Sequence, residues 1–181
     1  MDWLEDVNGR LRKRRAVLFA RDNPLIAEVT AALQTQGRRT VVLWALDLAA
    51  EMAAELARRL PGEDRPVQAL LASAAWARGQ APMAVARRAI LACHGLAREL
   101  DDPAAIALCH AVGQACSVVH TVGHGPGGPM YELTALVRRL GPDGCHGPVE
   151  ARQRLYLEKL RLWAAAGTPG PWAPFLRDAA P

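Results

Sequence analysis

Between Asp102 and Glu132 the sequence contains no Asp, Glu, Lys or Arg. A helical pattern from about Pro103 to His124 lies inside this uncharged stretch, and its opposite side is apolar. Because a surface helix normally carries charges on its polar side, this helix is expected to be covered by another helix, a ligand or a partner chain. At about 100° per residue, six polar side chains share an arc of roughly 120°: His110, Gln114, Ser117, His120, Thr121 and His124.

The composition favours helices throughout the chain. Aromatic residues make up 5% of the 181 residues, whereas Ala and Leu are abundant, a mix that suits helix packing and supplies few strand-forming residues. This length is sufficient for one domain with a core of its own. The sequence therefore predicts an all-α fold, a single-domain antiparallel bundle of about eight helices.

Capping residues and prolines mark where several helices begin. Asn23-Pro24 and Asp102-Pro103 each place a capping side chain directly before a proline at the first helical position. We expect residues 1–166 to form the helical domain and residues 167–181 to form a Pro-rich extended tail, either draped over the body or disordered. The expected helices cover about residues 3–20, 24–37, 40–60, 66–78, 82–100, 103–124, 130–140 and 149–163.

The sequence predicts a cytoplasmic protein. Its start, Met1–Asp6, lacks the basic and apolar parts of a signal peptide. A membrane span is not expected because three His, one Gln and the Gly-Pro break at 125–129 would be costly in lipid. The four cysteines form no C-x-x-C pair and are expected to be reduced thiols.

The histidines of the uncharged stretch raise the question of a metal. His120 and His124 are four residues apart, and His110 lies on the same stripe, so three imidazoles could ligate zinc, nickel or iron. The helix itself offers no carboxylate, although Asp47 could supply one if its helix packs on the stripe. The competing interpretation is that these side chains bond to facing helices or line an empty groove. No cofactor is therefore expected, and a divalent metal remains possible.

Two further groups suggest alternative functions. His94 sits between an apolar arc and Arg87, where it is either a boundary residue or the fourth histidine of a pocket with His110, His120 and His124. Such a pocket would belong to a ligand-binding protein or an enzyme. The basic run 10–15 permits nucleic-acid binding, but acidic residues one turn earlier favour a solvated helix face. Nucleic acid is therefore an unlikely partner.

Several short motifs follow one another between about residues 40 and 140: Trp44-Ala45-Leu46-Asp47, Asp64-Arg65-Pro66, Ala75-Trp76-Ala77-Arg78-Gly79, Ala92-Cys93-His94, Gly113, His120-x-x-x-His124 and Tyr131. In this order they resemble the Imm5-like group of bacterial immunity proteins. Gln114 stands where that group usually has His, and Leu48 stands after Asp47 where a Cys or similar residue is usual.

The resemblance implies a small cytosolic protein that binds and neutralises a cognate toxin without catalysing a reaction. The net charge of +4 favours an acidic partner or an apolar interface over the basic cleft of a nuclease. We expect the binding surface to include the polar arc, the 125–129 loop and Trp76. A homodimer is also expected, because a charge-free helix face not covered within the chain must be covered by another chain.

Overall fold

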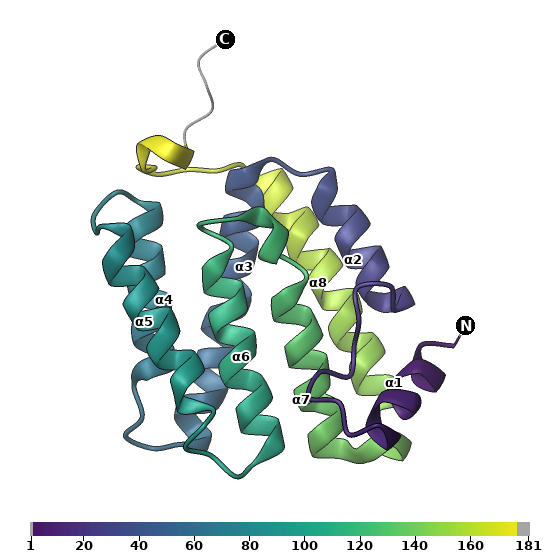
Figure 1. Cartoon of the computed structure of the whole chain (residues 1–181). Helices are drawn as coiled ribbons and strands as arrows, with labels where there is room; N and C mark the ends of the chain where they lie inside the picture. Colours follow the sequence, from purple (N-terminus) through teal and green to yellow (C-terminus); the bar gives the residue numbers. More distant parts are fainter. Residues whose placement is uncertain (1, 177–181) are drawn as a thin grey trace.

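The computed structural model describes residues 2–176, and this part of the chain folds into helices with no strand (Figure 1). The prediction of an all-α fold is confirmed. The α-helices are α1 Trp3–Arg12, α2 Pro24–Gln34, α3 Arg38–Arg59, α4 Arg65–Ala77, α5 Met83–Leu96, α6 Pro103–Ser117, α7 Gly127–Gly144 and α8 His146–Ala166. Two 3₁₀ turns accompany them: η1 Val122–His124 and η2 Pro174–Leu176.

Helix α6, which carries no charge, lies in the middle of the bundle. Helices α4 and α5 lie on one side of it and α7 on the other (Figure 1), and α3 also packs against it. Ten of its 15 residues are buried, and most of them are Ala, Gly or Cys. The cover expected for this helix is therefore supplied within the chain. This removes the reason for expecting a homodimer, which the structure does not support.

Two predicted helix starts are confirmed in atomic detail. Oδ1 of Asn23 accepts the backbone N–H of Leu25 at 3.2 Å, and Oδ1 of Asp102 accepts that of Ala104 at 3.0 Å. In both helices a proline follows the capping residue. These contacts satisfy backbone donors that the first turn of a helix leaves without a partner.

The first helix ends at Arg12 rather than near residue 20 as predicted. Arg14 has a φ of 51°, and the chain after it runs without helical structure to Pro24. Leu18 and Phe19 in this segment are completely buried, and the N–H of Leu18 donates to Oγ1 of Thr134 at 3.0 Å. A straight helix would carry these two side chains away from the core, so their burial explains the early end of α1.

The predicted break at 125–129 is in large part the start of α7. This helix begins at Gly127 and includes Pro129 in its first turn, where the missing N–H of a proline is tolerated. A Cβ atom at Gly128 would lie 3.3 Å from Cβ of Ala115, so glycine lets the two helices approach closely. The predicted 141–148 loop is also largely helical, apart from a kink where Gly141 has a φ of 73°.

A buried group of charges joins α3, α7 and α8. Glu132 is only 7% exposed, and it accepts the hydroxyl of Tyr156 at 2.8 Å. Nη2 of Arg152 lies 2.7 Å from the same carboxylate, and Nη1 of Arg152 donates to Glu51 at 2.7 Å. Lys159 links Glu51 to Asp47, with both distances at 2.8 Å. These ion pairs connect α3 to α8 and reach Glu132 on α7.

Residues 167–176 cross one end of the bundle (Figure 1). Trp172 and Leu176 are buried, and the N–H of Ala173 donates to the carbonyl of Ala77 at 2.9 Å. The expected tail is draped over the body in this range, and the remainder of it, 177–181, lies outside the described residues. No helix within residues 2–176 has the length and hydropathy needed to cross a membrane.

We predict that Arg152→Met lowers the free energy of unfolding by about 3–5 kcal/mol at pH 7.5, because it leaves Glu132 buried without its cation. Burial already raises the pKa of Glu132, and the loss of Arg152 raises it further. Stability of the variant then falls as pH rises from the ordinary glutamate pKa through the folded-state pKa. Urea denaturation should therefore show a smaller loss at pH 5 than at pH 7.5.

The control is Arg154→Met on the exposed side of the same helix, which should change stability by less than about 0.5 kcal/mol. Equal losses for Arg152→Met at the two pH values would contradict the buried-charge explanation.

Candidate functional site

The helix that carries the polar arc ends at Ser117, seven residues before the predicted end. Thr121 has extended backbone angles, φ −144° and ψ 115°, and the chain continues as η1. The run of β-branched residues before Gly123 disfavours a helix, and burial fixes Val118 and Val119 in the core. The prediction that His120 and His124 lie one turn apart on a helix is therefore wrong. The polar arc is confirmed only for His110, Gln114 and Ser117.

The structure nevertheless gathers most of the predicted site residues around one pocket of about 500 Å³. We call it the α5–α6 pocket, since these helices supply most of its walls. Of the seven predicted residues, His110 lies beside it in contact with His94, and Thr121 does not line it. The lining residues are Trp76, Met83, Arg87, Ile90, Leu91, His94, Gln114, Ser117, His120 and His124.

His94 and His110 form a pair at the side of the pocket. Their Nδ1 atoms are 2.9 Å apart, and the ring of His110 lies 5.2 Å from that of Tyr131. One Nδ1 must donate a proton and the other must accept it. Burial lowers the pKa of His94, with smaller contributions from the positive forms of His110 and His124, and burial also lowers the pKa of His110. Both rings are therefore neutral at pH 7.

Two glycines make room for the polar side chains of the pocket. A Cβ atom at Gly113 would lie 2.5 Å from Cε1 of His94, and one at Gly127 would lie 2.6 Å from Oε1 of Gln114. The same Oε1 lies 3.2 Å from Nδ1 of His124, which assigns the Nδ1 proton to that histidine. The ring and the amide thus lie directly on the backbone of neighbouring helices.

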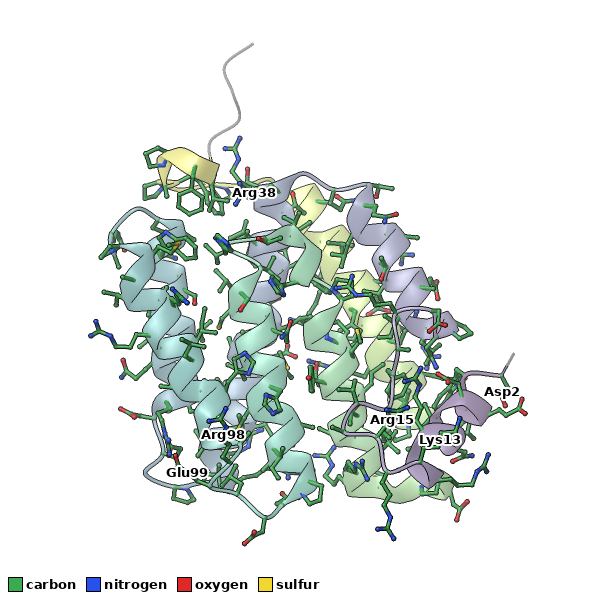
Figure 2. The ribbon with its side chains drawn as sticks, viewed as in Figure 1. Asp2, Lys13, Arg15, Arg38, Arg98 and Glu99 are labelled. Atoms are coloured by element: carbon green, nitrogen blue, oxygen red, sulfur yellow. The ribbon has the colours of Figure 1, made fainter. Side chains whose placement is uncertain are left out.

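The C-terminal segment packs against one of the residues that line the pocket, Trp76. The ring of Trp76 stacks on His120 with centroids 6.0 Å apart, and Phe175 contacts the same indole at 5.1 Å. Figure 2 shows Arg38 at this end of the molecule, where it donates to the carbonyls of His120 at 3.0 Å and Phe175 at 3.1 Å. One guanidinium thus connects α3 to the segment after α6 and to the C-terminal segment.

The structure does not assemble His120, His124, His110 and Asp47 as a set of metal ligands. Asp47 faces α8, where it accepts Nζ of Lys159 at 2.8 Å and Nε1 of Trp163 at 3.0 Å, and it does not line the pocket. Within residues 2–176, no three His, Cys, Asp or Glu side chains are arranged to hold a metal ion. The carboxylate that the metal hypothesis required is already bound to a lysine.

The cysteines are all buried and free, and burial raises their pKa values. The pKa of Cys109 rises to about 11 and that of Cys116 to about 12. Because the thiolate is the reactive form, these side chains belong to the core and not to a catalytic site.

The basic run lies far from the pocket. Lys13 and Arg15 are at the opposite corner of the molecule from Arg38 (Figure 2). Arg10 pairs with Asp6 at 3.1 Å, and Glu5 shares the shallow surface around the run. Acidic side chains interrupt this surface, as the sequence suggested.

Apart from His94, sequence reasoning missed the contribution of α5 to the pocket. Met83, Arg87 and Leu91 follow each other at intervals of four residues, and Ile90 and His94 continue the same side of the helix. This spacing is a helical stripe that reads as ordinary amphipathicity. The sequence feature that could have indicated the pocket is the placement of Met83 and Leu91 on the same helix face as Arg87.

We predict that Gly113→Ala displaces the His94 ring and raises the pKa of His94 toward its ordinary value, because the ring moves into water. Imidazole ¹⁵N shifts measured against pH report this change. The control is Gly95→Ala in α5, where a Cβ atom meets nothing within 4 Å. That variant should gain up to about 1 kcal/mol of stability from helix propensity and leave the His94 pKa unchanged. An unchanged His94 pKa in Gly113→Ala would show that the ring does not depend on this contact.

Comparison with known proteins gives a family match that covers the whole pocket. The family model described as "Imm-5 like putative immunity protein" matches residues 31–163, a wider range than the motifs covered and one that includes every residue lining the pocket. Searches of curated proteins and of solved structures find no significant match. Because the matched range spans most of the sequence, the chain belongs to the Imm-5 like putative immunity protein family.

Proposed function

We propose that this protein neutralises a protein toxin by binding it, without a catalytic step of its own, and that the α5–α6 pocket with its apolar rim is the binding surface. Membership of the immunity protein family supports a protein partner such as a toxin. It does not identify the surface, so the choice of surface depends on the exposed side chains.

The observation that carries the choice is the exposed apolar rim of the pocket. Met83 is 47% exposed and Leu91 is 57% exposed, and both line the pocket above the buried Ile90 and Trp76. Leu71 on α4 and Val85 on α5 are also large apolar side chains exposed to solvent, although neither lines the pocket. Exposed apolar side chains beside a concave site mark protein interaction surfaces.

The chemistry of the pocket favours binding over catalysis. In the described part of the chain, its lining contains imidazoles, a guanidinium, an amide and a hydroxyl, with no carboxylate or thiol. The histidines contact one another or Gln114 and Trp76. A general base is usually oriented by a third group beside a nucleophile, and the lining supplies no such arrangement.

A small-ligand site is the second candidate function, and the size of the pocket favours it. A volume of about 500 Å³ lies within the range of pockets that hold small molecules. The two functions differ in the role of the rim. A small ligand would contact the base of the pocket, whereas a protein would also cover Met83 and Leu91.

The experiment is to co-express the chain with candidate toxin domains, beginning with any that is encoded beside its gene. We expect restored growth and a stoichiometric complex measured by light scattering. Leu91→Glu should weaken the complex at least tenfold, because it places a charge in an apolar contact, which costs about 1.4 kcal/mol or more.

The matched control is Leu162→Glu, since Leu162 is 67% exposed on α8 and away from the pocket. It should bind and protect like the unmodified chain. Full protection by Leu91→Glu would exclude the proposed surface, and the absence of any complex would exclude the proposed function.

A further inference from the structure

The α5–α6 pocket has an unbalanced set of ionisable groups. Among the described residues, every ionisable side chain that lines it can carry a positive charge and none can carry a negative one: Arg87, His94, His120 and His124. Protein surfaces usually mix both signs, as the α3–α8 side of this molecule does. A pocket with donors and potential cations only is complementary to an anion.

Within residues 2–176, the elements around the pocket supply no carboxylate to its lining. Helix α5 contributes Arg87 and His94, α6 contributes His110 behind His94, and the segment after α6 contributes His120 and His124. Helix α7 contributes the phenol of Tyr131 against His110, and α4 contributes an indole. Four acidic residues on or beside neighbouring helices are paired elsewhere: Glu63 and Glu99 bind Arg65, and Glu51 and Glu132 bind Arg152.

The walls of the pocket identify the kind of anion. Met83, Ile90 and Leu91 line it beside the cationic groups, so an occupant must combine apolar carbon with one compact negative charge. A glutamate side chain has this form, with two methylene groups that pack on apolar carbon and a carboxylate that pairs with a guanidinium. A phosphate would leave the apolar wall without a contact.

We infer that the α5–α6 pocket binds a glutamate side chain of the partner protein, with its carboxylate beside Arg87 and the pocket histidines and its methylene groups against Leu91 and Ile90. This inference depends on the proposed function for the identity of the partner. The net charge of +4 agrees with a partner that presents an acidic surface.

A consequence is that glutamate binding is coupled to proton uptake. Burial favours the neutral form of His94 in the free pocket, and this ring becomes easier to protonate when a carboxylate lies beside it. Because the bound state then holds more protons than the free state, affinity should increase as pH falls. The increase is at most about tenfold per pH unit for each proton taken up.

The test uses two small probes with the full chain. N-acetylglutamate α-amide carries the single side-chain carboxylate, and N-acetylglutamine amide is its uncharged isostere. Imidazole ¹⁵N shifts are followed during titration at pH 6.0 and pH 7.5. We expect saturable shifts of His94 and His124 with the glutamate probe, a dissociation constant in the millimolar range that is lower at pH 6.0, and at least tenfold weaker binding of the glutamine probe.

Substitutions locate the carboxylate. Arg87→Gln should weaken binding of the glutamate probe at least fivefold, because it removes the permanent cation of the pocket. Arg88→Gln is the matched control, since Arg88 is the next residue of α5, is exposed and does not line the pocket. Both residues lie at the surface, so both variants are expected to fold.

Equal binding of the two probes, or no saturable shift up to about 50 mM, would overturn the inference. In that case a toxin complex that still forms and still depends on Leu91 would leave the proposed function intact. A chain that binds the glutamate probe but forms no complex with the toxin would overturn the proposed function and, with it, the assignment of this carboxylate to a toxin.

Discussion

The arrangement of this bundle depends on a central helix without charges. A charged side chain removed from water costs several kcal/mol unless a partner compensates it, so only an uncharged helix can be covered on almost every side. Helix α6 meets this condition and is covered by α3, α4, α5 and α7. Its remaining polar groups bond locally: Ser117 to the Gly113 carbonyl, Gln114 to His124, and His110 to His94. Where α5 does not cover them, Gln114 and Ser117 line the pocket.

Small residues convert this burial into close packing, at a local cost. Glycine inside a helix lowers stability by about 1 kcal/mol relative to alanine, yet Gly113 lies in the middle of α6. The ring of His94 occupies the space that a side chain at this position would need. Gly127 does the same for the amide of Gln114. At Gly113 the loss of helix propensity is the cost of placing the His94 ring against the helix backbone. At both glycines a polar side chain packs directly on a rigid backbone.

Features set by neighbouring residues could be predicted from the sequence, and features set across the chain could not. Asn23 and Asp102 identify helix starts because a cap acts within three residues. The non-helical segment after α1 is held in the core by a bond from Leu18 to Thr134, 116 residues away in sequence. Likewise, the sequence allows Asp47 to lie beside the histidines, but in the fold Asp47 binds Lys159, which is 112 residues later in the chain.

The candidate site shows the same division. The sequence pointed to the polar residues His94, Gln114, Ser117, His120 and His124, which line one pocket, but its reason for grouping the last two was a helix that ends before them. Helical spacing and spatial proximity are different criteria. Proximity here comes from the turn after Ser117, which returns His124 to Gln114, and no periodicity rule describes such a turn.

A non-helical wall would ordinarily weaken a binding site, because ordering a flexible segment on binding costs free energy. In this chain the wall is held before any partner arrives. Arg38 donates to the carbonyls of Val119 and His120 as well as to that of Phe175, and its guanidinium lies 5.5 Å from the Phe175 ring. The indole of Trp76 fills the space between Phe175 and His120. The C-terminal segment therefore contributes to the pocket indirectly. Through Trp76 and Arg38 it helps to hold His120, which lies beyond the end of α6.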